Sequence, residues 1–206
     1  MEDFGNEILS KIEERDNPRK RRIINLFVIY ALVFVLAIAS SFAISNYVLS
    51  MVKVNGESME PTLSSGDVLF VNKVKKVQIE DVIIIKMFVG TDYEKLYIKR
   101  VYGFEGDAVW AKDGVVYREY TSKGQRKVQK FTDAKAKKTA DFPKQIVPKG
   151  CIFFLGDNRG NSQDSRWLYS QPKANVVGVV TGFSIKYKKT ITKFFEWYVK
   201  EKANEY

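Results

Sequence analysis

Hydrophobic residues follow two different patterns along this chain. A continuous apolar segment runs from Ile23 to Val52 without a charged side chain. Beyond it, short runs of β-branched and aromatic residues alternate with Gly, Asp and Asn, which is typical of strands joined by turns. The sequence therefore predicts one long apolar helix followed by a domain built mainly from β-strands.

The apolar segment predicts a single transmembrane helix at residues 23–49, because it exceeds the roughly 20 residues that cross a bilayer core. Four basic residues at 19–22 precede it. The positive-inside rule then makes residues 1–22 cytoplasmic and residues 50–206 extracytoplasmic. A cleavable secretory signal is the alternative, because residues 37–39 read Ala-Ile-Ala. The segment is much longer than the roughly 7–15-residue core of such a signal, so we expect a retained, single-pass anchor in the cell membrane.

Seven runs beyond the anchor have the composition of strands; they lie at residues 68–71, 82–85, 96–98, 108–110, 115–117, 152–155 and 176–180. A Lys-Asp-Gly sequence at 112–114, between two of these runs, is a hairpin signal. No helical pattern alternates with the runs, which argues against a parallel α/β sheet. We therefore expect a mainly β domain with an antiparallel β-sheet from about 50 to 188. Apolar spacing at 191–202 is compatible with a short C-terminal helix.

The net charge of +10 is concentrated in one stretch. Residues 120–150 hold nine Lys and Arg side chains against Asp133 and Asp141, and we expect them to form a basic insertion outside the sheet. A nucleic-acid surface usually interleaves aromatic and basic residues, and aromatics are few here, so no nucleic-acid partner is expected. Attraction to anionic lipid headgroups fits a membrane-tethered domain better; a solvated basic loop is the simplest interpretation.

Histidine is absent from the chain, which restricts its catalytic chemistry. Neither a Ser-His-Asp triad nor a histidine-bearing metal site can be assembled, and neither a metal nor an organic cofactor is implied. The single cysteine, Cys151, cannot form an intramolecular disulfide and is expected to pack in an apolar strand. A serine nucleophile in this chain would therefore have to give its proton to some other side chain.

Ser58 and Lys99 are the candidates for such a pair. Lysine accepts a proton only when it is neutral, so its pKa must fall roughly 2–3 units from about 10.4. Burial in apolar surroundings supplies shifts of that size, and Lys99 is flanked by Tyr97, Ile98 and Val101. From chemistry alone, Ser58 as an ordinary turn residue and Lys99 as a solvent-facing lysine stay open.

Longer motifs around these two residues resemble a known family. Residues 56–63 read Gly-Glu-Ser-Met-Glu-Pro-Thr-Leu, residues 97–101 read Tyr-Ile-Lys-Arg-Val, and residues 156–166 read Gly-Asp-Asn-Arg-Gly-Asn-Ser-Gln-Asp-Ser-Arg. In this order, after an N-terminal anchor, they resemble the three signature segments of the bacterial type I signal peptidases, and specifically Gram-positive members with one anchor. A Gly-Asp-Val sequence at 66–68 matches a further short motif of that family.

The resemblance implies a role for each matching position. Ser58 would be the nucleophile, with its backbone N–H in the oxyanion hole, and Lys99 would be the general base, oriented by Ser162. Gly56 stands where some members carry a hydroxyl residue, so a side-chain oxyanion donor is missing. The resemblance further implies four structural partners joined in ion pairs and five residues that line shallow apolar pockets. The first set is Arg100, Asp157, Asp164 and Arg166, and the second is Val52, Val54, Met59, Leu63 and Ile98.

The activity implied is that of a membrane-bound serine endopeptidase that cleaves signal peptides from exported preproteins after small-x-small sites. Preprotein signal peptides, membrane lipid and the export machinery would be its partners. The nine residues from Leu49 to Ser58 span at most roughly 30 Å, which keeps the serine near a membrane surface. Two alternatives remain. The anchor argues against a Ser/Lys self-cleaving protease, and intact Ser58, Lys99 and Ser162 argue against a catalytically silent homologue that acts as a membrane-tethered binding subunit.

Overall fold

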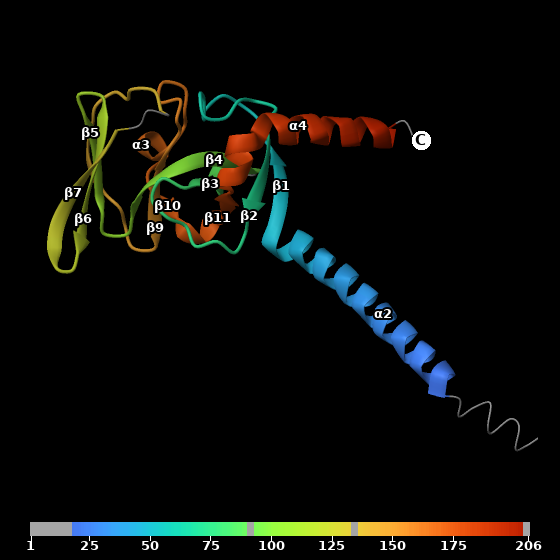
Figure 1. Cartoon of the computed structure of the whole chain (residues 1–206). Coiled ribbons are helices and arrows are strands. Elements are labelled where there is room, and N and C mark those ends of the chain that lie inside the picture. The colour runs from blue at the N-terminus through green and yellow to red at the C-terminus, as the bar shows by residue number, and fades with distance from the viewer. Residues whose placement is uncertain (1–17, 90–92, 133–135, 204–206) are drawn as a thin grey trace, which may run out of the picture. The chain divides into compact units, whose positions relative to one another are not determined.

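The computed structural model describes residues 18–89, 93–132 and 136–203, and the chain divides into two compact units between Asn46 and Tyr47. The first unit contains helix α2 (Pro18–Ala43), shown in blue in Figure 1. Among the described residues, α2 is the one helix that is long and apolar enough to cross a membrane. Residues 1–17, most of the predicted cytoplasmic segment, lie outside the described residues.

The predicted helix at 23–49 is placed too far along the chain. The α-helix begins at Pro18 and ends at Ala43, a π-helical turn (η1, Ile44–Val48) follows, and Leu49 already belongs to a strand. Ser and Asn residues gather near this end of the segment, and these residues favour caps and turns over helix interiors. The apolar character of the segment continues because strand β1 is itself apolar.

The second unit is built on a seven-stranded sheet in the order β1-β2-β11-β3-β4-β9-β10. Every neighbouring pair in this sheet is antiparallel. The predicted antiparallel β-sheet domain is therefore confirmed. The strands are β1 (Leu49–Lys53), β2 (Val68–Asn72), β11 (Val176–Val180), β3 (Val82–Val89), β4 (Tyr93–Phe104), β9 (Cys151–Leu155) and β10 (Gln171–Pro172).

A second, four-stranded antiparallel sheet has the order β7-β6-β5-β8. Its strands are β5 (Ala108–Lys112), β6 (Val115–Ser122), β7 (Gln125–Phe131) and β8 (Phe142–Ile146). The predicted hairpin joins β5 to β6, with Asp113 and Gly114 at positive φ angles of 54° and 79°. This geometry suits the twist of a two-residue hairpin.

The basic stretch 120–150 was expected to leave the sheet, and the structure corrects this expectation. It completes β6 and supplies β7 and β8. Most β7 side chains are exposed, because this strand lies at the edge of its sheet. An edge strand that is exposed on both faces lacks the apolar alternation by which strands are predicted from sequence.

Three apolar clusters form the core of the second unit. One surrounds Leu63 and Met59 beneath the turn that follows β1, and a second lies around Ile83 and Phe154 in the main sheet. In the third, Tyr102 and Phe153 of the main sheet pack with residues of the second sheet such as Val109. The two sheets therefore share a continuous core, which gives the strand β4 a rigid setting.

Helices complete the second unit: α3 (Ser165–Leu168), the 3₁₀ turn η2 (Lys173–Asn175) and α4 (Gly182–Ala203). The predicted C-terminal helix is confirmed, but it begins nine residues earlier than expected, at Gly182 instead of Ile191. Figure 1 shows α4 and the second sheet at opposite ends of this unit. Helix α4 contacts β2, where the backbone N–H of Val68 donates to Thr192 Oγ1 at 2.9 Å.

Candidate active site

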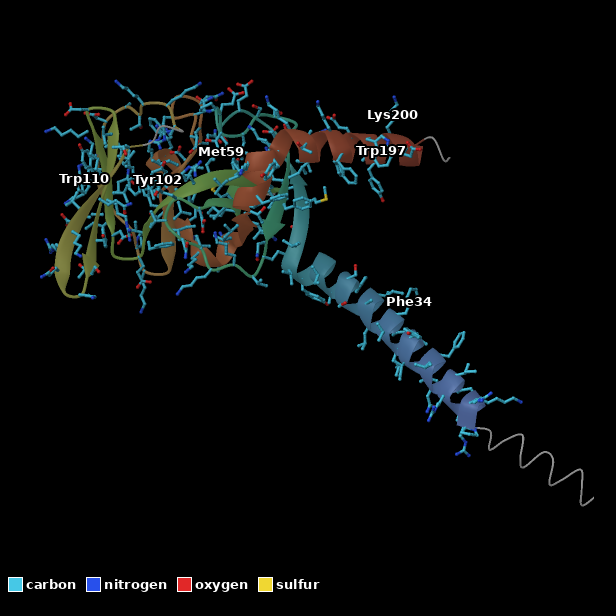
Figure 2. All side chains as sticks on the ribbon, viewed as in Figure 1. Phe34, Met59, Tyr102, Trp110, Trp197 and Lys200 are labelled. Atoms are coloured by element: carbon cyan, nitrogen blue, oxygen red, sulfur yellow. The ribbon has the colours of Figure 1, made fainter. Side chains whose placement is uncertain are left out.

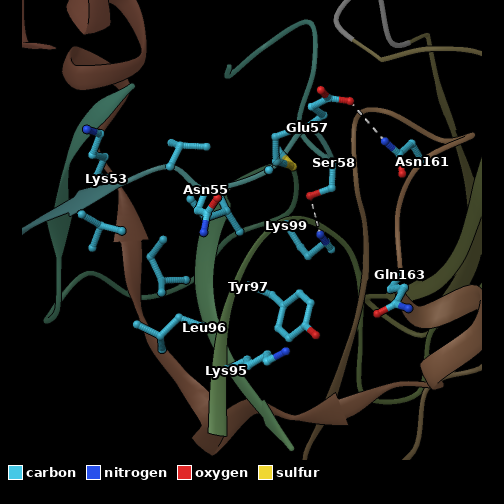
Figure 3. A pocket seen from close by; sticks show the side chains of 16 residues that line it. Lys53, Asn55, Glu57, Ser58, Lys95, Leu96, Tyr97, Lys99, Asn161 and Gln163 are labelled. Carbon is cyan, nitrogen blue, oxygen red and sulfur yellow. Dashed lines mark hydrogen bonds between the residues drawn. The ribbon is translucent and has the colours of Figure 1, made fainter. Parts of the chain in front are cut away.

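Ser58 and Lys99 meet in a direct hydrogen bond. Ser58 lies in the turn-rich segment between β1 and β2, and Lys99 lies within β4, far along the chain. Lys99 Nζ donates to Ser58 Oγ at 2.7 Å, drawn as a dashed line in Figure 3. A nucleophile and a base at this distance satisfy the first geometric requirement for proton transfer.

Burial sets the protonation state of Lys99, which is only 1 % exposed to solvent. Loss of solvent lowers the pKa of Lys99 from 10.5 to about 8, against the opposing attraction of Asp164 and Asp157. The positive charge of Arg166 also lowers the pKa of Lys99, but its effect is the smallest of these four. The result is a lysine that is partly neutral near pH 8, as a general base must be.

Two ion pairs lie beside the dyad: Arg100–Asp157 joins β4 to the 156–166 segment, whereas Asp164–Arg166 lies within that segment. Arg100 donates from Nε and Nη2 to the two carboxylate oxygens of Asp157 at 2.9 and 2.6 Å. Arg166 likewise donates from Nε and Nη2 to the two carboxylate oxygens of Asp164 at 2.8 and 2.9 Å. Thr62 Oγ1 donates to Asp157 Oδ2 at 2.6 Å, which ties the first pair to the turn that carries Ser58. The four residues expected to form ion pairs do so.

Asn158 fixes the backbone on both sides of the nucleophile candidate. Its N–H donates to the Ser58 carbonyl at 2.9 Å, and its side-chain Nδ2 donates to the Glu57 carbonyl at 3.1 Å. Sequence reasoning placed Asn158 within a motif but gave it no role. Its partners are backbone carbonyls, which no residue pattern reveals, so only the folded chain identifies this contact.

Ser162 does not make the hydrogen bond to Lys99 that the sequence led us to expect. Its Oγ is buried and, within the described residues, has no hydrogen-bond partner. It lies instead against Gly156, which is close to both Ser162 Oγ and the Ser58 carbonyl. The bend of the 156–166 segment thus directs this hydroxyl toward Gly156.

Gly156 packs closely against Ser162 Oγ and the Ser58 carbonyl oxygen. Its replacement by alanine is therefore expected to destabilise the fold. A Cβ at Gly156 would overlap Ser162 Oγ and lie 2.5 Å from the Ser58 carbonyl oxygen. We expect Gly156→Ala to lower the free energy of unfolding by about 1–3 kcal/mol, as overpacking typically does. Chemical denaturation measures it. Gly160→Ala is the matched control, because a Cβ there meets nothing within 4 Å; equal stability of the two variants would contradict the packing described.

Gly56 contributes only backbone to the site. Its φ of +98° suits glycine, and its N–H donates to Ser65 Oγ at 3.3 Å and not into the pocket. No hydrogen bond among the described residues uses the Ser58 N–H. The Ser58 N–H is therefore a donor that stays available beside the nucleophile candidate.

A cavity of about 760 Å³ opens beside the dyad between β1 and β4. Four residues expected to form apolar pockets line it: Val52, Val54, Met59 and Ile98. Leu63 does not; it is fully buried in the core, a correction that follows from the turn directing its side chain inward. Further lining residues escaped the sequence analysis because they come from segments far apart in the chain: Lys53, Asn55, Glu57, Ile84, Lys95, Leu96, Tyr97, Asn161 and Gln163.

Several known proteins are similar to this chain in sequence. The family model described as signal peptidase, peptidase S26, matches residues 26–184. Signal peptidase I T of Bacillus subtilis is 32% identical over 167 residues, covering 75% of this chain and 83% of that protein. Signal peptidase I of Bacillus caldolyticus is 36% identical over 165 residues, covering 73% and 85%. The crystal structure of a signal peptidase I from Enterococcus faecalis has 26% identity and a TM-score of 0.41, and the match covers 52% of this chain and 99% of that one.

Proposed function

Because the chain belongs to the signal peptidase family, peptidase S26, we propose that it is a membrane-anchored serine endopeptidase that removes N-terminal signal peptides from exported preproteins with a Ser58–Lys99 dyad. The observation that carries the proposal is the 2.7 Å hydrogen bond between a buried lysine and a serine that borders an open cavity. A structural lysine would gain nothing from a lowered pKa, whereas a general base requires it.

The proposed reaction proceeds in two steps. Neutral Lys99 takes the proton of Ser58 Oγ as the oxygen attacks the carbonyl carbon at the cleavage site. The tetrahedral intermediate collapses, Lys99 protonates the departing amine of the mature protein, and the signal peptide stays attached to Ser58 as an ester. Lys99 then takes a proton from water, and the hydroxide attacks the ester and restores Ser58.

The oxyanion of the intermediate requires hydrogen-bond donors. The Ser58 N–H is the donor supported by its position and by the absence of another acceptor among the described residues. Losing one such donor typically costs about 2.7–4 kcal/mol of transition-state stabilisation. Asn158 acts as a positioning residue for this N–H, because it binds the carbonyls of Glu57 and Ser58 on either side of it.

Substrate specificity follows from the cavity and from the sheet edge beside it. Strand β1 pairs with β2 on one side and is the terminal strand of the main sheet. Its free edge suits an extended substrate segment that adds as a further strand. The apolar side chains of Val52, Val54, Met59 and Ile98 would then contact alternate substrate residues and leave room for small ones. This gives the small-x-small preference.

Helix α2 is the proposed anchor. It has the length and apolar composition to cross a bilayer. The four basic residues at 19–22 favour a cytoplasmic N-terminus by the positive-inside rule. The second unit, with the dyad, would then lie outside the cytoplasm, where exported preproteins emerge and where the export machinery and lipid are its neighbours.

The rate of cleavage is expected to rise with pH through a midpoint near 8. The pKa of Lys99 is lowered to about 8 by burial, and only the neutral amine accepts the serine proton. The fraction of active enzyme therefore increases about tenfold per pH unit well below the midpoint and levels off above it. Measuring kcat/KM from pH 6 to 10 tests this; a rate that falls over this range would contradict a lysine base.

Direct assay of the reaction tests the proposal itself. The full chain in detergent would be incubated with a preprotein that carries Ala-x-Ala before its cleavage site, and the new N-terminus read by mass spectrometry. We expect one cut directly after the second alanine, and none when that alanine is replaced by phenylalanine. No cut in either preprotein, with the fold intact, would favour a catalytically silent homologue.

A further inference from the structure

The first half of helix α4 is fastened to the catalytic unit. Ser184 is fully buried, and Ile191 is nearly so. Lys188 Nζ donates to the Thr62 carbonyl at 2.7 Å and forms an ion pair with Asp67 at 3.0 Å. With the Thr192 hydrogen bond to β2, these contacts fix the position of the helix as far as residue 192.

The second half of α4 is largely exposed. All six residues from Glu196 to Glu201 are exposed, so nearly two turns of the helix are open on every side. The exposed residues include large apolar side chains: Phe194 at 63 %, Trp197 at 57 %, Tyr198 at 47 % and Val199 at 49 %. Figure 2 shows Trp197 and Lys200 on this projecting part of the helix. A soluble domain seldom exposes such a group of large apolar side chains on one short segment.

The charge and the aromatic content of this helix indicate what it contacts. Helix α4 carries six lysines against two glutamates. Two copies of this surface would repel each other, which disfavours a dimer. Lysines beside Trp, Tyr and Phe on one helix are typical of helices that lie at the surface of a membrane with anionic lipids. Trp and Tyr are enriched at that interface.

All but the first three residues of α4 lie beyond the family match, which ends at residue 184. Its projecting part, residues 196–201, therefore lies outside the residues that the family model matches. The proposed anchor supplies the membrane, because only η1 separates α2 from β1 along the chain.

We propose that residues 193–201 of α4 form a second membrane contact, in which the aromatic side chains enter the headgroup region and the lysines bind anionic lipid. The inference rests on the membrane anchoring in the proposed function but not on proteolysis. Because Lys188 bonds the Thr62 carbonyl, this contact would hold the turn that carries Ser58 at a fixed height above the bilayer.

Tryptophan fluorescence of the full chain in vesicles tests this contact. The chain would be reconstituted in phosphatidylcholine vesicles, with and without a third of phosphatidylglycerol, using lipids brominated near the headgroup as quenchers. The chain has three tryptophans, so quenching of Trp197 is expected to remove up to about a third of the emission. Trp197→Phe should abolish that part. Trp167→Phe is the matched control, because Trp167 is exposed at 73 % in α3, away from this helix.

The dependence of Trp197 quenching on anionic lipid tests whether the lysines of α4 contribute to the contact. We expect quenching of Trp197 to be at least about twofold greater with phosphatidylglycerol and to decrease in the double variant Lys193→Glu/Lys200→Glu or at high salt. Equal quenching in the wild-type and Trp197→Phe chains would overturn the proposal. The proposal would also be overturned if Trp197 stayed unquenched and cross-linking showed that α4 contacts a second copy of the chain. Cleavage activity is measured separately, so a failed dyad leaves this readout unchanged.

Discussion

Replacement of Lys99 by methionine is expected to abolish cleavage while stabilising the folded domain at neutral pH. Methionine fills nearly the same volume in the buried site but cannot accept a proton. Loss of a general base that also activates the nucleophile should reduce kcat by roughly 10³-fold or more. Rates of preprotein cleavage at pH 8 measure this loss.

The stability effect follows from the lowered pKa of Lys99. In the unfolded chain the amine keeps its pKa of 10.5, whereas in the folded state the pKa is about 8. Between these values the unfolded state binds more protons, so wild-type stability gains about 3 kcal/mol from Lys99 as the pH rises from 8 to 10.5. The variant lacks this gain. Its stability advantage over the wild type should therefore be largest at pH 7 and decrease by about that amount by pH 10.5.

Lys95→Met provides the matched control. Lys95 lies four residues earlier in the same strand and lines the same cavity, but it is exposed. This variant should keep the pH midpoint near 8, and its stability difference from the wild type should stay nearly constant across the same pH range. If Lys99→Met retained substantial activity, or if the two variants behaved alike, the assignment of Lys99 as the base would be wrong.

Ser58→Ala is expected to reduce cleavage to background while leaving the fold intact. Within the part of the chain that the structure describes, the Ser58 side chain makes one hydrogen bond, which it accepts from Lys99. Removing the hydroxyl eliminates the atom that attacks the substrate, for a loss of roughly 10³-fold or more in kcat. Unfolding stability should change by no more than about 1 kcal/mol, the typical worth of one hydrogen bond.

Ser64→Ala serves as the control for this variant. Ser64 is exposed and lies in the same turn-rich segment between β1 and β2. Its replacement should leave the cleavage rate within about twofold of the wild type. Cleavage by Ser58→Ala at a rate near that of Ser64→Ala would exclude Ser58 as the nucleophile.

The sequence predicted those strands and turns that depend only on neighbouring residues. The β-branched runs became strands, and the Lys-Asp-Gly sequence became the β5–β6 hairpin, because alternation and positive φ at Asp113 and Gly114 are properties of neighbouring residues. The motif resemblance identified Ser58, Lys99 and the four residues that form ion pairs, but the pairing of these four came from the structure. The catalytic roles of Ser58 and Lys99 stay predictions, and the variants above test them.

Features that depend on tertiary contacts escaped prediction. Leu63 follows Met59 by one helical turn's spacing and joins the same core cluster, yet only Met59 also borders the cavity. Side-chain direction in an irregular turn depends on what packs against it. Strand β7 is exposed on both faces, so its sequence carries no apolar period. The same limit hid Asn158, which binds backbone atoms that any sequence would provide.

Acylation of Ser58 is the measurement that tests the central claim most directly. The full chain at pH 8 would be mixed with an activated ester that carries an Ala-x-Ala acyl group, quenched with acid, and mapped by mass spectrometry. The dyad predicts a single acyl group on Ser58 in the wild type and in Lys95→Met, and none in Ser58→Ala or Lys99→Met. An acyl group on another residue, or full acylation of Ser58 in Lys99→Met, would contradict a Ser58 nucleophile activated by Lys99.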